Sequence, residues 1–318
     1  MTDGYGRKIE YLRMSVTDAC NLNCSYCMPE EGSFRCNCNN NLTVDEFAEI
    51  VTAAAELGIK KLRITGGEPL VRRDIVELVR RMSEIKGIED ISMTTNATLL
   101  APAARDLYEA GIRRINISLD TTDTEKYARI TRGGRLTDAI EGIRAALAAG
   151  MNPVKLNAVL MGGINDDEIE DLARLTVDYP VELRFIELMP IGNTRALSKD
   201  AYVPSSLVLE RLPELEKIDS EKHSVAKLYR LPGAKGKIGL ISPLSNHFCG
   251  ECNRLRLTAD GCLKPCLHSA DEISVRGLHG AELKEKILFA VNKKPRMHGE
   301  LSTTSPSESK RSMNRIGG

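Results

Sequence analysis

Three cysteines near the N-terminus have a spacing that suits an iron–sulfur cluster. Cys20, Cys24 and Cys27 are separated by three and by two residues. Cysteine thiolates hold such clusters, usually four to a cluster. Three thiolates on one loop leave one iron with an open position, which is where a metal site does chemistry. These cysteines are therefore the candidate catalytic residues and metal ligands, although zinc remains an alternative if Cys36 or Cys38 joins them.

A second group of cysteines lies towards the other end of the chain. Cys249, Cys252 and Cys266 are separated by two and by thirteen residues, with Cys262 inside the longer gap. Three of them could hold a second cluster. The spacing C-x2-C-x9-C-x3-C suits a four-cysteine zinc site equally well, so the residues alone leave the metal open.

Several cationic residues have a sequence context that suggests anion binding. Arg13, Arg63 and Lys155 each lie within an otherwise apolar segment, where a merely solvated charge is not expected. Arg254 and Arg256 are two residues apart, so on a strand they share one face. Arginine makes forked contacts with phosphate oxygens and lysine acts as a point charge. We expect this set to bind an anionic ligand.

The composition excludes several classes of protein. The chain has 44 basic and 44 acidic residues, so it is not a generic binder of nucleic acid or of membrane surfaces. The first residues lack the basic and apolar regions of a secretory signal, and no apolar run is long enough to span a bilayer. We expect a cytoplasmic protein. An odd number of cysteines, nine, then indicates metal ligands or reactive thiols rather than disulfides.

The pattern of apolar residues predicts strands that alternate with helices. Six strands are expected, at Tyr11–Val16, Lys61–Thr65, Ile91–Thr95, Arg114–Leu119, Val154–Leu160 and Val181–Leu188. Five helices are expected between them, at Thr43–Leu57, Arg73–Ile85, Ala101–Ala110, Leu136–Ala149 and Asp166–Val177. Such alternation gives a parallel sheet with right-handed crossovers. Six units predict an α/β fold built as a partial (β/α)6 barrel of the TIM type, with ligands at the C-terminal ends of the strands.

The alternation ends at about Leu197, which divides the chain into a core at 1–196, a C-terminal region at 197–292 and a tail at 293–318. The tail is polar, and its composition favours disorder. The expected elements of the C-terminal region are a helix at Ser205–Leu212, strands at Ala226–Leu231 and Lys237–Ile241, and helices near Asp271–Gly277 and Ala281–Val291.

Motifs around the first cysteines resemble those of the radical S-adenosylmethionine (SAM) superfamily. Its signature has the same cysteine spacing with an aromatic residue before the third cysteine, where Tyr26 stands. Gly66-Gly-Glu-Pro69 follows the second expected strand, like the superfamily's segment for the methionine amino group of SAM. Glycines let the backbone approach a ligand closely, and Glu68 can accept a hydrogen bond from an ammonium group.

With both cysteine triples, the chain resembles the GTP 3′,8-cyclases, the first enzymes of molybdenum cofactor biosynthesis. The likeness runs from about Gly6 to Gly318. The segments that carry it are Arg13–Asp18, Leu62–Asp74, Thr94–Asn96, Asn116–Asp120, Arg184–Met189 and Asn253–Leu257. The chain departs from the family pattern at Ala19, at Ala97 and at Cys36–Asn41, and none of these departures removes an expected ligand.

The resemblance implies two [4Fe–4S] clusters and SAM as cofactors, the second cluster being carried by the C-terminal extension of the barrel. The cluster ligands are then Cys20, Cys24 and Cys27, and Cys249, Cys252 and Cys266. The implied SAM contacts are Tyr26, Gly67, Ser118 and Met189. The implied GTP contacts are Arg13, Arg63, Thr94, Lys155, Arg254, Leu255 and Arg256.

The resemblance also implies a lyase that cleaves SAM to 5′-deoxyadenosine and methionine and converts GTP to (8S)-3′,8-cyclo-7,8-dihydroguanosine 5′-triphosphate. The implied partners are an electron donor and a cyclic pyranopterin monophosphate synthase that takes the product; a homodimer is a further expectation. The ending Met313–Gly318 resembles that of the family and implies an arm whose two glycines reach the active site.

Two other functions remain open from the sequence. One is a radical SAM enzyme with an auxiliary cluster that acts on a peptide or another small molecule, although the basic residues argue against an uncharged substrate. The other is a zinc-binding α/β scaffold or regulator. Protein purified without oxygen would contain iron and sulfide in excess of zinc if it is either of the two radical SAM enzymes, and zinc if it is the scaffold or regulator.

Overall fold

The computed structural model describes residues 1–29, 40–219, 225–302 and 304–317. Cys36, Cys38 and Gly318 lie outside the described residues, so the expectations for them are not tested. In the described part of the chain, no helix combines the length and the apolar character needed to cross a bilayer.

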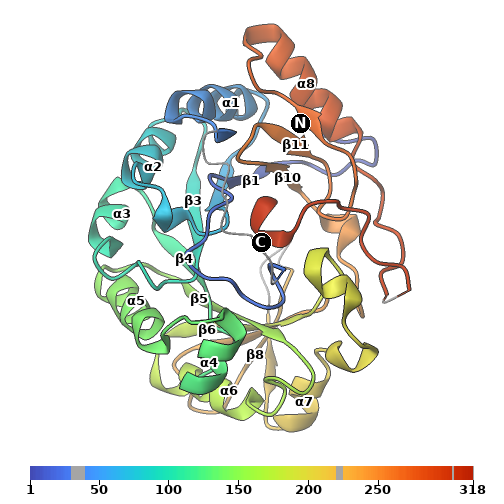
Figure 1. Ribbon diagram of the computed structural model, residues 1–318. Coiled ribbons are helices and arrows are strands. Elements are labelled where there is room, and N and C mark those ends of the chain that lie inside the picture. Colours follow the sequence, from blue (N-terminus) through green and yellow to red (C-terminus); the bar gives the residue numbers. More distant parts are fainter. Residues whose placement is uncertain (30–39, 220–224, 303, 318) are drawn as a thin grey trace.

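Six parallel strands form the core of the sheet in sequence order, β1 to β6. They curve around a central space that helices enclose from outside (Figure 1). The prediction of a partial six-stranded α/β barrel is confirmed, and every expected strand is present with small shifts at its ends. The strands are β1 (Tyr11–Ser15), β2 (Lys61–Thr65), β3 (Asp90–Thr95), β4 (Arg114–Ser118), β5 (Val154–Leu160) and β6 (Val181–Glu187).

The outer helices are those that the apolar periodicity predicts, with one addition. Between β4 and β5 the chain forms α4 as well as the expected α5. The helices are α1 (Val44–Glu56), α2 (Ile75–Ser83), α3 (Ala104–Ala110), α4 (Thr124–Thr131), α5 (Leu136–Ala148) and α6 (Ile169–Asp178). α1 begins at a capping box, in which the Thr43 side chain accepts from the Glu46 backbone N–H and the Glu46 side chain accepts from the Thr43 N–H.

Alternation along the strands separates the hydrophobic core from the interior of the barrel. Leu12, Met14, Leu62 and Ile64 are fully buried between the sheet and the helices. The residues between them on β1 and β2 therefore face the central space, because successive side chains on a strand point to opposite faces. This alternation is what brings polar side chains into the barrel.

The C-terminal region extends the sheet at both of its edges. β9 pairs in parallel with β6, and β10 pairs in parallel with β1, which gives the order β12-β11-β10-β1-β2-β3-β4-β5-β6-β9-β8-β7. The remaining elements are β7 (Glu216–Ile218), β8 (Lys227–Arg230), β9 (Lys237–Ile241), β10 (Arg254–Leu257), β11 (Cys262–Lys264), β12 (Ile273–Ser274), α7 (Leu207–Arg211) and α8 (Gly280–Asn292). Short 3-10 helices are η2 (Pro69–Val71), η3 (Gly192–Ala196), η4 (Lys199–Ala201), η5 (Cys249–Glu251) and η6 (Met313–Arg315).

One expected helix is wrong. The stretch near Asp271–Gly277 contains β12 instead, in which Ile273 pairs antiparallel with Leu263 of β11. Val275 continues this pairing by donating to the carbonyl of Gly261 at 2.9 Å. Pairing with a neighbouring strand satisfies the backbone here, and a helix of this length would have little stability of its own.

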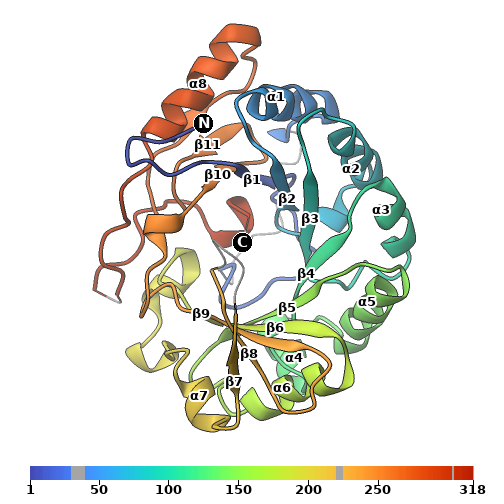
Figure 2. The same ribbon diagram turned by 180° about the vertical axis from the view of Figure 1, so that it is seen from behind.

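Residues 304–317, which we call the C-terminal arm, do not follow the expectation of disorder. The arm crosses from the outside of the molecule to the centre of the ring of strands, where the C-terminus lies in both views (Figures 1 and 2). The arm is held by hydrogen bonds to residues that lie far from it in the sequence, such as Arg195, Arg256 and Asp18. Composition could not show these contacts, because low hydrophobicity indicates disorder only when polar groups find no partners.

Candidate functional site

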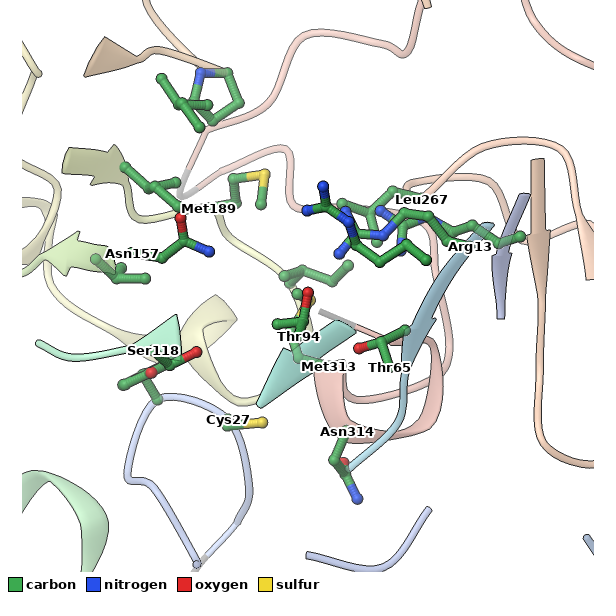
Figure 3. Close-up of a pocket in the computed structure, with 18 of the residues that line it drawn as sticks. Arg13, Cys27, Thr65, Thr94, Ser118, Asn157, Met189, Leu267, Met313 and Asn314 are labelled. Atoms are coloured by element: carbon green, nitrogen blue, oxygen red, sulfur yellow. The ribbon is translucent and has the colours of Figure 1, made fainter. Parts of the chain in front are cut away.

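A cavity of about 380 Å³ occupies the barrel interior at the C-terminal ends of the strands. All six expected cluster cysteines line it, and Cys27, Ser118, Thr94, Met189 and Arg13 project into one space in Figure 3. The other expected contacts that line the cavity are Tyr26, Gly67, Arg63, Arg254 and Arg256. The position matches the rule for parallel α/β barrels, in which sites form where strands end.

The first cysteine triple is on the loop that follows β1. Hydrogen bonds fix the loop against the end of α4: the Asn23 N–H donates to the Thr131 carbonyl at 3.2 Å and the Ser25 N–H to the Ile130 carbonyl at 2.9 Å. All three thiols are free and partly buried. Burial raises the pKa of Cys20 to about 11 and, together with the nearby Cys20 thiol, that of Cys27 to about 12. Because thiolates are the metal-binding form of cysteine, cluster binding would release these protons.

Three free thiols that face one cavity form a suitable donor set, and they would hold three irons of a cluster. In the described ranges of the chain, no group of three or more His, Cys, Asp or Glu side chains is arranged to hold a single metal ion.

Gly66 and Gly67 press the end of β2 against this cysteine loop. A Cβ on Gly67 would lie 2.3 Å from the Ala19 carbonyl oxygen, and one on Gly66 would lie 2.7 Å from that of Thr17. The Gly67 N–H donates to the Thr17 carbonyl at 2.7 Å. Glycine is therefore required at both positions because two backbone segments pass too close together for a side chain. The same lack of a side chain would let a ligand approach this backbone.

Glu68 is buried and organises the loop after β3. Its oxygens accept from the Thr95 hydroxyl and the Asn96 N–H, both at 2.7 Å, and from the Leu70 N–H at 3.1 Å. Burial raises the pKa of Glu68 to about 7 even though these bonds favour its ionised form. The carboxyl lines the cavity while it holds the loop, so its first role is to connect the second and third strands.

Tyr26 is tied to the far side of the barrel. Its hydroxyl donates to Asp120 Oδ2 at 2.8 Å, and Asp120 Oδ1 accepts from the Val159 N–H at 2.9 Å. Burial raises the pKa of Asp120 to about 6. This bridge holds Tyr26 in place where it lines the cavity together with Cys27.

The second cysteine triple lies on the C-terminal extension. Arg7 supports its first member by donating to the Cys249 carbonyl at 2.8 Å, and it pairs with Asp3 at 2.7 Å. Burial opposes ionisation of Cys252, but the nearby Lys294 and Arg254 lower its pKa overall. Cys262, in contrast, is on β11 and does not line the cavity.

Three arginines form a row across neighbouring strands. In the parallel register Arg13 is paired with Arg256 of β10 on one side and with Arg63 of β2 on the other. Paired residues of adjacent strands point to the same face, so all three face the cavity. The rings of Tyr11 and Phe248 lie near Arg254, with its guanidinium carbon 6.0 and 5.6 Å from their centroids.

The arginine row has an electrostatic cost in the absence of a ligand. Burial, with the like charges of Arg256 and Arg63, lowers the pKa of Arg13 well below its ordinary value. Burial and Arg254 lower the pKa of Arg256 to about 10. Like charges gathered away from water destabilise one another, so the row favours a polyanionic ligand.

Two of the expected contacts do not line the cavity. Leu255 lies between Arg254 and Arg256 and points to the opposite face, where it is 1% exposed in the hydrophobic core. Lys155 faces the barrel interior, but its Nζ lies 3.1 Å from Glu182 Oε2. Neither side chain reaches the space that the arginine row faces.

Residues that sequence reasoning did not select also line the cavity, among them Arg184, Asn157, Lys294 and His268. Arg184 is in β6 and donates from Nε to Glu182 at 2.6 Å. The rule that identified Arg13, a charge inside an apolar strand, would have identified Arg184. Lys294 had no such signal, because it follows the last helix in a polar stretch.

The C-terminal arm reaches the arginine row. Arg256 Nη1 donates to the carbonyl oxygens of Ile316 at 3.2 Å and Gly317 at 2.5 Å. Asn314 Nδ2 donates to the carbonyl of Asp18 at 3.1 Å, immediately before the first cysteine loop. In Figure 3, Met313 and Thr94 lie between Cys27 and Arg13. The arm therefore contacts both halves of the cavity.

Comparison with known proteins decides between the alternatives that the residues left open. A family model described as the radical SAM superfamily matches residues 14–176, and one described as Molybdenum Cofactor Synthesis C matches residues 181–300. The chain is 50% identical over 321 residues to a GTP 3′,8-cyclase of Alkaliphilus oremlandii, with 100% of both chains covered. This chain belongs to the GTP 3′,8-cyclase family.

A second GTP 3′,8-cyclase, from Peptoclostridium acidaminophilum, is 51% identical over 322 residues and covers 100% of this chain and 98% of that one. Among solved structures, Streptococcus suis SuiB has a TM-score of 0.63 at 17% identity, covering 91% of this chain and 66% of SuiB. That likeness concerns the fold. As a radical SAM member of the GTP 3′,8-cyclase family, the chain has SAM and two [4Fe–4S] clusters as its cofactors, and the zinc scaffold is no longer a candidate.

Proposed function

We propose that this chain catalyses the reaction for which its family is named, as a lyase that converts GTP to (8S)-3′,8-cyclo-7,8-dihydroguanosine 5′-triphosphate in the first step of molybdenum cofactor biosynthesis. The observation that carries the proposal is the row Arg256, Arg13 and Arg63. It faces a cavity that both cysteine triples also line.

The two ends of the cavity suit different parts of the reaction. Cys20, Cys24 and Cys27 would hold the first cluster, and Tyr26, Gly67, Ser118 and Met189 would contact SAM. Cys249, Cys252 and Cys266 would hold the second cluster on the side of the arginines. When bound, these groups supply a hydrogen-abstracting radical at one end and an open iron at the other.

The chain's own residues bind, orient and exclude water. Arg13, Arg63, Arg254 and Arg256 would hold the triphosphate, since forked contacts with several oxygens fix a phosphate chain in position. We add Arg184 to this set, because it faces the same cavity from β6. The arm contacts Arg256 through the carbonyls of Ile316 and Gly317, and Met313 and Asn314 line the cavity. In this position the arm would limit the entry of water, which protects a radical reaction from side reactions.

The test is an anaerobic assay with reductant, SAM and GTP. We expect 5′-deoxyadenosine and the cyclised nucleotide to form together, with GTP required for both. Iron and sulfide should exceed zinc in the purified protein. Formation of 5′-deoxyadenosine at the same rate with and without GTP would contradict the substrate assignment and favour a peptide or another small molecule.

The partners and the location are also proposals. A one-electron donor must reduce the first cluster in each turnover, and a cyclic pyranopterin monophosphate synthase would take the product. We place the reaction in the cytoplasm, where thiols stay reduced.

A homodimer is the expected oligomeric state. Sedimentation or light scattering of the cluster-loaded protein would detect the dimer, and a monomeric mass would contradict that expectation.

A further inference from the structure

We propose that Arg311 is the positioning residue that locks the C-terminal arm into the active site, through a double ion pair with Asp260 and Glu272. The inference rests on the proposed function, because it assigns a role in that reaction. It concerns how the arm is held, by three residues that do not themselves line the cavity.

Arg311 uses its guanidinium in two forked contacts. Nη1 and Nη2 donate to the two oxygens of Asp260 at 3.0 and 2.9 Å. Nε and Nη2 donate to the two oxygens of Glu272 at 2.7 Å each. The Arg311 side chain is only 11% exposed. Bidentate pairs of this kind fix direction as well as distance, and partial burial protects them from screening by salt.

Both carboxylates are themselves held in place. The Thr258 hydroxyl donates to Asp260 Oδ1 at 2.5 Å. Lys264 Nζ lies 3.3 Å from Glu272 Oε1, and the Lys264 side chain is 0% exposed. Asp260 is in the turn between β10 and β11, and Lys264 is on β11 two residues before Cys266. The lock therefore attaches the arm to the hairpin that leads into the second cysteine triple.

The same hairpin receives the tip of the arm. Lys264 is paired with Arg256 across β10 and β11, and Arg256 donates to the carbonyls of Ile316 and Gly317. Arg311 and Gly317 are six residues apart on the arm and both contact this one hairpin. Two attachment points on one rigid element fix the segment between them. Without the first, the position of Gly317 would depend on the tip itself and on the single hydrogen bond from Asn314 to the Asp18 carbonyl, together with exposed contacts, among the residues that the structure describes.

The other attachments of the arm are a neutral hydrogen bond from Asn314 to the Asp18 carbonyl at 3.1 Å, an exposed ion pair, and contacts further from the tip. Arg315 pairs with Asp18 at 3.1 Å, but its side chain is 52% exposed, and exposed pairs contribute little. Arg195 donates to the carbonyls of Ser307 and Ser309, on the side of the arm remote from the tip. Arg311 is thus the buried ionic contact nearest the tip among the described residues.

The test compares Arg311→Met with Lys310→Met. Both remove one positive charge from the arm, and Lys310 is an exposed neighbour. For Arg311→Met we expect kcat to fall by about 10- to 100-fold, since small misplacements cost rates of this size. The KM for GTP should stay within about threefold, and the iron content should equal that of the wild type. Lys310→Met should match the wild type throughout.

A second measurement reports on the arm without activity. Backbone amides from Ser307 to Ile316 should exchange hydrogen faster in Arg311→Met, while exchange in β1 to β6 should stay unchanged. Arg311→Lys keeps the positive charge but loses the forked contacts, so its exchange rates in the arm should lie between those of the wild type and of Arg311→Met. The pair Asp260→Asn with Glu272→Gln should reproduce Arg311→Met, and combining all three changes should add little further loss if they act as one unit.

Three results would overturn the proposal. Wild-type turnover and exchange in Arg311→Met would show that the ion pairs do not hold the arm. Faster exchange with unchanged kcat would show that the position of the arm does not matter for the reaction. Loss of iron would place Arg311 in assembly of the second cluster instead. Failure of the proposed function would appear differently, as wild-type enzyme that makes no product from GTP.

Discussion

Arg256 donates from Nη1 to the carbonyl oxygen of Gly317 at 2.5 Å, which joins the last described residue of the chain to one end of the arginine row. Arg256 also stands in register with Arg13 across β10 and β1. One guanidinium thus contacts the arm and belongs to the anion site. This relationship joins the arm to the candidate site, and it leads directly to the first prediction.

Replacing Gly317 by alanine should reduce turnover by about tenfold or more. Gly317 has φ +71, and a Cβ there would lie 2.4 Å from Thr65 Cγ2. The left-handed conformation alone costs an L-residue roughly 1–2 kcal/mol, and the contact adds to this. Gly299→Ala is the control, since nothing lies near a Cβ at that position.

Deleting Gly317 and Gly318 should also reduce turnover while both clusters assemble. A fully active deletion variant would rule out a role for the arm.

Replacing Gly67 by alanine should prevent the first cluster from assembling. The added Cβ would lie 2.3 Å from the Ala19 carbonyl and push the cysteine loop away from β2. We expect the iron content to fall to about half, because the second triple is on a different part of the sheet. Gly4→Ala, at an exposed position with open space, should keep the full content. A fully loaded Gly67→Ala protein would show that the loop can shift freely.

Replacing Arg63 by methionine should weaken GTP binding more than it changes the chemical step. Arg63 belongs to the predicted triphosphate site as one member of the arginine row. Hydrogen bonds to charged groups contribute about 1.5–3 kcal/mol, so the KM for GTP should rise by at least about tenfold. Cluster content and SAM binding should be unchanged. Arg73→Met, which removes an exposed arginine, provides the matched control. An unchanged KM would remove Arg63 from the site.

Replacing Glu68 by glutamine should change how the stability of the cluster-free protein depends on pH. Burial raises the pKa of Glu68 from 4.5 to about 7. A carboxyl whose pKa is raised on folding favours the folded state below pH 4.5, and this contribution is lost as pH rises to 7. The loss is roughly 3 kcal/mol by order of magnitude. Denaturant unfolding at pH 5 and pH 8 should show a smaller fall for Glu68→Gln than for the wild type. An equal fall in the free energy of unfolding for both proteins would contradict the raised pKa of Glu68.

Local patterns were sufficient to predict the core of the fold. Each strand from β1 to β6 was found from its apolar run, because the hydrophobic effect acts on every such segment in the same way. α4 was missed, although Asp123 is a good N-cap whose side chain accepts from the Lys126 N–H at 2.7 Å. The stretch near Asp271 was wrongly expected to be helical. Short segments take the structure that their neighbours impose, which a local pattern does not contain.

The sequence by itself determined that cysteine-bound metal sites and a basic site occur together in this protein, and its family membership decided for iron–sulfur clusters. The spacing of Cys20, Cys24 and Cys27 indicated a cluster with an open iron, and alternation along the strands placed Arg13 and Arg63 on one face. Only the tertiary structure decided which strands became neighbours. The pairing of β10 with β1 set Arg256 beside Arg13. The folding of the arm against the β10–β11 turn and the start of β12 gave Arg311 its two carboxylates. Periodicity specifies the face of a residue, whereas its neighbours depend on contacts between segments more than two hundred residues apart.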